Sequence, residues 1–242
     1  MTLDASQIIF QDKFRVTDNI YVRHSTIGDI LDIGEQRYFQ ILHVLTGIPS
    51  DEKWILHQSG IDWMEITDLQ YFAMVAPTLK KEDVGIFLPG LDFKRFKLYK
   101  RPDGDFVYSD AENGYTIDFR GHKIISDCLC TIHRIKKKVE KAGNAYTKQM
   151  LIKEDEQRHK LAMAKQSEFH STLMPLISSM INREGFKYDY SSIRGMLFGQ
   201  FMDAVARLQL IVATDQLVQG IYAGNVDAKK IKKKNLDWTR EI

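Results

Sequence analysis

The chain has 242 residues, 44% hydrophobic and 27% charged, which is the composition of a globular protein with room for a substantial core. It contains no run of about 18 apolar residues and no secretory signal at its start, so we expect neither a membrane span nor export from the cytoplasm. The net charge of +2 is uneven. Residues 1–92 hold 7 Lys and Arg against 14 Asp and Glu, a net charge of −7, which leaves +9 for the remainder. The two parts could attract each other within one chain or between copies, or form two separately solvated faces.

The front segment, residues 1–92, is predicted to be an acidic helical domain with a short strand. Ser25–Thr26, Ser50 and Thr67 each precede acidic residues, the pattern of a helix N-cap followed by a negatively charged first turn. Glycine or proline closes each apolar stretch that follows. In order, we expect a strand at 20–22 and helices at 34–47, 50–60 and 67–77.

Residues 93–125 change to the two-residue period of strands. Pro102–Asp105 is a strong reverse-turn sequence between two aromatic runs and predicts a hairpin. After Asn113–Gly114, the apolar residues Tyr115, Ile117 and Phe119 alternate with polar ones, as in a strand with one buried face. We therefore expect a small antiparallel β-meander.

Residues 126–172 are predicted to form a charged helical connector, helical from Ser126 onward. Between Ala145 and His170 the sequence is rich in both signs of charge and sparse in apolar residues, which indicates an exposed helix. The overall fold class is therefore α+β and predominantly helical, without β-α-β alternation.

The last segment, residues 173–242, is predicted to be an amphipathic helical region. From Ile193 to Tyr222, apolar residues recur at helical spacing over much of the circumference, and a Gly-containing turn and a lysine run follow. Such a helix must be covered on more than one side, by this chain or by another. We name four candidate partner contacts, with a place in the core as the equal alternative: Phe198, Phe201, Leu208 and Trp238. Trp238 would pin the tail to a groove on this chain or on a partner.

The sequence shows no catalytic signature. The seven histidines have neither H-x-x-x-H nor H-E-x-x-H spacing, and Cys128 and Cys130 are too close for an ordinary disulfide and too few for a zinc site. We expect these cysteines to be small buried residues, and we expect no metal, no cofactor and no enzymatic activity. Two basic runs, from Arg134 to Lys141 at a helix end and from Lys229 to Lys234, are interpreted as solvated faces in preference to phosphate-binding sites.

Short stretches spread over most of the chain carry a family resemblance. They are Tyr21–Ile30, Gly34–Glu35, Tyr38–Phe39, Pro49–Asp51, Gly60–Asp62, Lys141–Asn144, Pro175–Ile177, Gly185–Tyr190, Gly220–Gly224 and Leu236–Trp238. Together they resemble proteins encoded among the tail genes of bacteriophages of Gram-positive hosts. The resemblance implies a role in virion morphogenesis, as a tail assembly chaperone or an accessory tail protein.

Our hypothesis is a non-enzymatic tail assembly chaperone in the host cytoplasm that shields an apolar helical client such as the tape-measure protein. One alternative is a structural component of the virion, such as a baseplate, connector or tail-completion protein, in which copies associate head to tail. A weaker alternative is a nucleic-acid-binding module that uses the two lysine runs. A homo-oligomer is compatible with the first two hypotheses.

Overall fold

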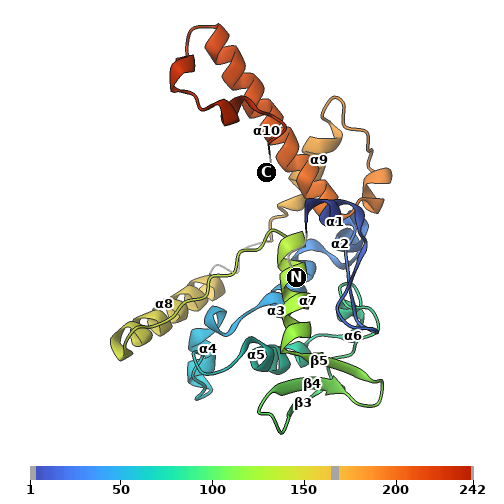
Figure 1. Cartoon of the computed structure of the whole chain (residues 1–242), viewed down its shortest axis with the longest axis vertical. Coiled ribbons are helices and arrows are strands. Elements are labelled where there is room, and N and C mark those ends of the chain that lie inside the picture. Colours follow the sequence, from blue (N-terminus) through green and yellow to red (C-terminus); the bar gives the residue numbers. More distant parts are fainter. Residues whose placement is uncertain (1–3, 165–168, 241–242) are drawn as a thin grey trace.

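The structure is a computed structural model that describes residues 4–164 and 169–240. The fold is α+β, as the sequence predicted: the described residues contain ten α-helices and two small antiparallel sheets. Figure 1 shows a body, residues 4–164, from which residues 169–240 project. We call this projecting part the arm.

The first half of the body is helical apart from one two-stranded ladder, and its predicted elements are largely confirmed. The Thr26 hydroxyl accepts a hydrogen bond from the Asp29 N–H (3.1 Å), and the Asp29 carboxylate accepts one from the Thr26 N–H (2.7 Å), which starts a helix ahead of the one predicted from residue 34. Gly34, with φ of +88°, separates this helix from the next. The elements are α1 (Ala5–Phe10), β1 (Lys13–Arg15), β2 (Tyr21–Arg23), α2 (Ile27–Ile33), α3 (Glu35–Thr46), α4 (Lys53–Gln58), α5 (Asp68–Val75) and α6 (Lys81–Val84).

The predicted β-meander is present, with strand order β3-β4-β5, but its last strand is shorter than expected. Its strands are β3 (Lys97–Lys100), β4 (Phe106–Asp110) and β5 (Tyr115–Asp118). The prediction that Phe119 continues the strand was wrong. The Asp118 carboxylate accepts a hydrogen bond from the Gly121 N–H (2.7 Å) and so caps helix α7 (Phe119–Ile132). That helix therefore starts well before Ser126, where the sequence placed the change of period.

Helix α7 runs through the middle of the body and buries Ile125, Leu129 and Ile132. Cys128 and Cys130 are buried and free, as predicted. One core cluster draws on all four predicted segments of the chain, from Leu42 of α3 through to Ile177 of the arm. A continuous core of this kind makes the body and the base of the arm one packed unit.

After α7 the chain loses regular structure until helix α8 (Ala145–Ala164). The first basic run, from Arg134 to Lys141, therefore follows a helix end instead of lying within it. Helix α8 is mainly exposed, as predicted, but one side packs on α4: the Asp155 carboxylate accepts a hydrogen bond from the Trp54 N–H (2.8 Å). The prediction extended this helix to His170, which lies beyond its end, and residues 165–168 lie outside the described part of the chain.

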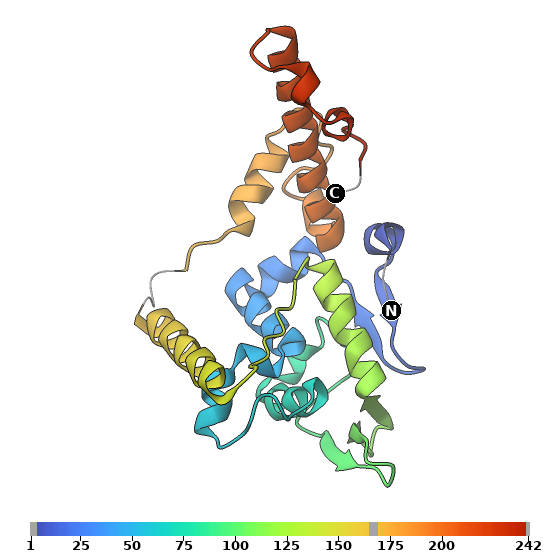
Figure 2. The same ribbon diagram turned by 60° about the vertical axis from the view of Figure 1, so that its left-hand side comes forward.

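The arm contains two helices and a tail that folds back (Figures 1 and 2). The predicted helix from Ile193 begins later, because Ile193 lies in a 3₁₀ turn and Leu197 pairs with Thr26 in an isolated β-bridge. Among the helices of the described residues, none is long and apolar enough to cross a membrane. The arm's elements are α9 (Leu173–Ile181), η3 (Ser192–Gly195), α10 (Phe198–Tyr222), η4 (Ala228–Lys230) and η5 (Lys233–Leu236).

Candidate partner-binding surface on the arm

Helix α10 divides into two parts with different surroundings. We call residues 198–205 the root and residues 208–222 the distal half. The root belongs to the body's core: Phe201 is fully buried and Phe198 is only 5% exposed. At the start of the root, the Phe198 N–H donates to the Ser25 carbonyl (2.9 Å). The acidic front segment thus fills the apolar face of the root.

A buried histidine holds the first turn of α10. His24 Nε2 accepts a hydrogen bond from the Gly199 N–H (2.8 Å), and Nδ1 lies 3.2 Å from the Gln11 carbonyl. A carbonyl only accepts, so Nδ1 carries the proton and the ring is neutral. Burial lowers the pKa of His24, which favours this neutral form. A Cβ atom at position 199 would lie 2.8 Å from His24 Cε1, so the close approach requires glycine.

A second histidine packs against the root from α7's end. The His133 ring stacks on Phe198, with centroids 5.0 Å apart. Its Nδ1 donates to the Leu129 carbonyl (2.8 Å), and its Nε2 accepts from the Tyr38 hydroxyl (2.7 Å). Burial lowers the pKa of His133 to about 4. Both histidines at the root therefore act as neutral hydrogen-bonding groups at pH 7.

A carboxylate of the body caps the other helix of the arm. Glu35 Oε1 accepts hydrogen bonds from the N–H groups of Thr172 (3.0 Å) and Leu173 (3.1 Å), at the start of α9. Burial raises the pKa of Glu35, but the hydrogen bonds from Ser171, Thr172 and Leu173 outweigh it and lower the pKa overall. A negative charge at a helix N-terminus is favourable. Together with the ion pair of Asp32 and Arg194 (2.6 Å), this cap fixes the arm on the body.

The distal half of α10 turns a different face to its surroundings. Counting from Leu210 as position i, the apolar residues of this face recur at i+1, i+7, i+8 and i+11. The polar Thr214, at i+4, lies on the same face. At 3.6 residues per turn, this face is rotated by about 180° from the face that the root buries. The side that continues the root's face carries exposed Gln209, Gln216 and Gln219, with the partly buried Val212 among them. The residues of the distal face, all partly buried except the buried Thr214, are Leu210, Ile211, Thr214, Leu217, Val218 and Ile221.

The tail of the chain covers this distal face. We call residues 225–240 the strap. Arg207 Nη1 donates to the carbonyl groups of Trp238 (3.0 Å) and Arg240 (2.9 Å), which ties the end of the strap to α10. At its start, the strap approaches so closely that a Cβ atom on Gly220 would lie 3.0 Å from Val226 Cγ2. Thr214 lies two turns beyond Arg207 on the same face and is 4% exposed, so it is under the strap.

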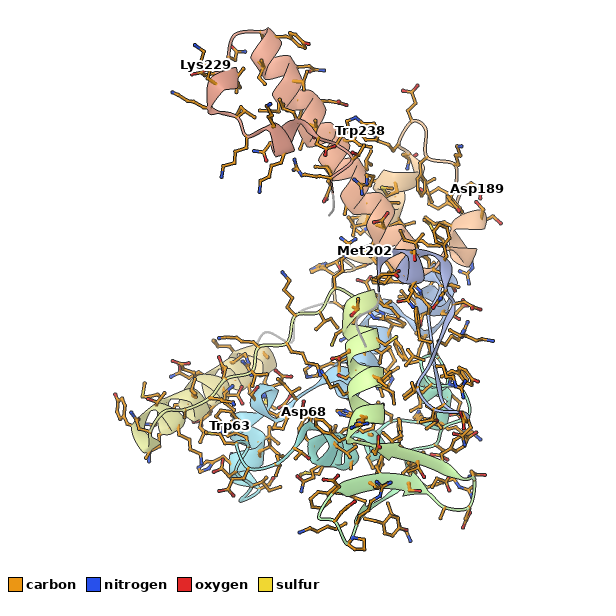
Figure 3. The ribbon with its side chains drawn as sticks, viewed as in Figure 1. Trp63, Asp68, Asp189, Met202, Lys229 and Trp238 are labelled. Atoms are coloured by element: carbon orange, nitrogen blue, oxygen red, sulfur yellow. The ribbon has the colours of Figure 1, made fainter. Side chains whose placement is uncertain are left out.

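The strap contributes little buried surface of its own. Every residue between 225 and 240 is exposed or only partly buried. The Trp238 side chain is 53% exposed, and Tyr222 at the end of α10 is 87% exposed. Figure 3 shows Trp238 beside the middle of α10 and Lys229 near the far end of the arm. The strap is held by backbone contacts and leaves its large side chains accessible.

The four candidate contacts predicted from the sequence lie in different environments. Phe198 and Phe201 are core residues, so the described conformation does not offer them to a partner. Leu208 is partly buried and packs against the edge of the core. Trp238 is anchored through its carbonyl group, and its ring stays accessible. Leu208 therefore borders the core, and the Trp238 side chain is the one of the four that stays largely accessible.

The structure also shows functional candidates that sequence reasoning missed, chiefly Arg207 and Thr214. Each is a polar residue that interrupts the apolar pattern of α10. The available signal was their spacing: Arg207, Thr214 and Ile221 are seven residues apart, which places them on one stripe of the helix.

The negative charge of the front segment is partly compensated by ion pairs, whereas the positive charge of the strap is not. The acidic front segment meets basic residues of the rear through Asp32 with Arg194 and through Asp62 with Lys148. The five strap lysines between Lys229 and Lys234 are exposed and make no ion pair with another described residue. Part of the charge asymmetry therefore joins the two parts of one chain, and the excess positive charge lies on the arm.

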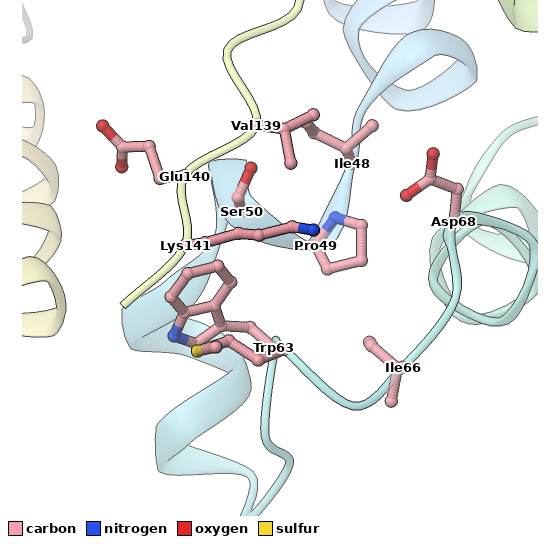
Figure 4. Close-up of a pocket in the computed structure, with 10 residues that line it drawn as sticks. Ile48, Pro49, Ser50, Trp63, Ile66, Asp68, Val139, Glu140 and Lys141 are labelled. Carbon is pink, nitrogen blue, oxygen red and sulfur yellow. The ribbon is translucent and has the colours of Figure 1, made fainter. Parts of the chain in front are cut away.

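A separate pocket of about 280 Å³ lies on the body between Pro49, Trp63 and Lys141 (Figure 4). Asp68 and Lys141 line it on different sides, and burial raises the pKa of Asp68. Glu140 is already paired with Lys53 (2.7 Å). The pocket is smaller than most small-molecule sites. The described residues contain no group of three or more His, Cys, Asp or Glu that could hold a metal ion, and we assign the pocket no ligand.

Comparison with known proteins gives a family match that falls on the arm. A family model described as the YomV second domain matches residues 164–242. The arm is similar to a phage-derived domain. The YomV second-domain match begins at the last residue of α8 and includes α9, α10 and the strap, so it coincides with the projecting unit seen in the structure. No curated protein and no solved structure matched the chain.

Proposed function

We propose that this protein is a non-enzymatic virion morphogenesis protein of a phage, and specifically a tail assembly chaperone of the host cytoplasm. Its client is an apolar helical protein, with the tape-measure protein as the candidate. Support comes from the phage-derived domain at residues 164–242 and from the surface of the arm that this domain provides.

The observation that carries the proposal is the state of the distal half of α10. This helix presents an apolar face of helical spacing, and its cover in the described structure is a strap without buried side chains. A face of this kind fits an amphipathic helix, which docks through residues at i, i+3, i+4 and i+7. Residues 208–222 rise about 22 Å along the helix axis, enough for four turns of a client helix.

The firm attachment of the arm suits a chaperone in which helix α10 keeps its position on the body when a client binds. The hydrogen bonds of His24 and Glu35 and the buried Phe201 join the arm to the body. The distal half then extends away from the body, where a long client can run past it (Figure 2). A rigid presenting surface lowers the ordering cost of binding.

Co-expression with the tape-measure product tests the proposal directly. The two proteins should co-purify through an affinity tag on this chain, and the tape-measure product should stay soluble longer in its presence. If the tape-measure product never associates with this protein, the chaperone function is wrong.

A structural virion component is the second candidate, favoured by the excess of lysine on the strap and of acid at the front of the body. Opposite charges at two ends of a molecule suit a head-to-tail contact between copies. Mass spectrometry of purified particles separates the two functions. A chaperone is found in the lysate of infected cells and is absent from mature virions, whereas a structural component is present in virions at fixed stoichiometry.

A further inference from the structure

We propose that the apolar face beneath the strap is the client-binding site, and that the strap is an intramolecular stand-in that an amphipathic helix displaces. This inference rests on the proposed function and deepens it. It assigns the binding site to six residues of the distal half: Leu210, Ile211, Thr214, Leu217, Val218 and Ile221.

The strap covers the apolar face of the distal half incompletely. The face has the spacing of a helix-docking surface, yet the two short 3₁₀ turns of the strap, η4 and η5, bury none of their residues. Val226 and Ile231 are the partly buried apolar residues of the strap. A client helix with an apolar residue every three or four positions would bury more of the face than the strap does.

A polar group under the strap lacks a hydrogen-bond partner among the described residues. The Thr214 hydroxyl is buried and has no hydrogen-bond partner among the described residues. A buried hydroxyl without a partner is unfavourable, and the strapped state leaves this polar group of the face unsatisfied. A client with a small polar group opposite Thr214 would satisfy it.

The strap is fastened to α10 at few points. Its end is held by the two hydrogen bonds from the Arg207 guanidinium, and its start by the turn at Gly224, where φ is +73°. Segments with little buried apolar surface open at low free energy. The strap can therefore leave α10 while the root stays in the core.

Arg207 gives a test because its guanidinium fastens the strap, and it is not one of the six residues assigned to the site, although it lies on the same stripe of α10 as Thr214. In an Arg207→Ala variant of the full chain, the strap should be released, which hydrogen exchange of residues 225–240 reports without any client. Binding of the co-expressed tape-measure product should become about tenfold tighter, because the competing strap no longer occupies the site. A chain that ends at Asn225 should show the same gain.

Two controls separate the effect of releasing the strap from the effect of removing positive charge. Arg183→Ala removes another exposed arginine of the arm, one outside the strap contacts, and should leave client binding unchanged. Replacing the five strap lysines with glutamine keeps the strap and removes its positive charge, so binding should stay within about twofold if apolar contacts dominate.

Each other outcome counts against a defined claim. If the wild type captures the client and the released or shortened strap changes nothing, the strap does not compete and the inference is overturned while the proposed function stands. If strap release weakens capture, the strap is part of the binding surface and the inference is again wrong. If no variant captures the client, the proposed function fails and the inference fails with it.

Discussion

The root and the distal half of α10 are built from similar residues and serve different purposes. In the root, Phe198 and Phe201 are sealed by the body, and both ring nitrogens of His24 have a hydrogen-bond partner. In the distal half, the apolar face has turned to the other side of the helix and meets the lightly packed strap. One continuous helix thus contributes its first turns to the fold and, in our proposal, its last turns to a partner.

Apolar periodicity alone does not distinguish a helix that packs in the core from one that docks a partner, since both parts of α10 show it. The two parts differ in what covers them and in the direction of their apolar faces. The rotation of about 180° between the faces prevents the body from covering both. Variants that change one part of α10 and spare the other therefore test whether the two parts differ.

The largest expected effect is a stability difference between matched truncations in the two parts. Phe201→Ala should lower the free energy of unfolding by about 3–5 kcal/mol, because it leaves a cavity in the core. Val218→Ala should cost less than about 1 kcal/mol, because its side chain is partly exposed. Urea unfolding followed by circular dichroism measures both. Equal losses would show that the distal half is as much a part of the core as the root.

Acid should destabilise the body and the root, and the distal half contains no histidine to respond. Burial lowers the pKa of His122 to about 4 from an ordinary value of 6.5. The unfolded chain then binds a proton first as the pH falls, so stability is complete above about pH 6.5 and decreases between pH 6.5 and pH 4. This shift corresponds to about 3 kcal/mol for His122.

Unfolding free energies measured at several pH values check this dependence. His122→Leu should remove its share of the slope. A wild-type stability that stays constant from pH 7 to pH 4.5 would contradict the assignment of buried neutral histidines.

Two glycines of α10 offer a further matched pair. Gly199→Ala would push a Cβ atom to 2.8 Å from His24 Cε1, and we expect a loss of about 1–3 kcal/mol. Gly220→Ala meets only the Val226 side chain of the strap, at 3.0 Å, and alanine favours a helix interior. Its effect on unfolding should be near zero. Thermal unfolding of both variants tests the contrast, and a larger loss at position 220 would reverse our account.

The smallest effect concerns how the arm is fastened to the body. Glu35→Ala removes the cap of α9 and should cost about 1–2 kcal/mol. Asp32→Ala removes an exposed ion pair with Arg194 and should cost under about 1 kcal/mol. Denaturant midpoints of the two variants give the comparison. If Asp32 matters more than Glu35, the cap is not the main fastening of α9.

Much of the fold followed from local signals in the sequence. Thr26 and Thr67 cap the helices that they were predicted to cap, and Pro102–Asp105 forms the predicted turn. Phe119 was misplaced because the two-residue period of the strand runs into the capping side chain of Asp118, and periodicity does not register a cap. Strand β1 was missed because Phe14 is its one apolar residue, between Lys13 and Arg15, whereas β2 overlaps the apolar run from Ile20 to Val22.

The candidate site was less predictable because it depends on contacts between distant residues. The bond from His24 to Gly199 and the cap from Glu35 to Thr172 join positions more than a hundred residues apart. No local pattern could indicate which apolar residues of α10 the body would take. Phe198 and Phe201 were therefore proposed as contacts together with Leu208 and Trp238, although only the last two lie outside the core.

The division of α10 is best tested by hydrogen exchange, measured residue by residue in the free protein and with the tape-measure product bound. In the free protein, the amides of residues 201–205 should exchange only on global unfolding, and those of residues 211–222 should exchange at a lower free energy. Addition of the client should slow exchange in the distal half and leave the root unchanged. Protection gained at the root, or no change in the distal half of a complex that has formed, would contradict the division of α10 into a core part and a partner-binding part.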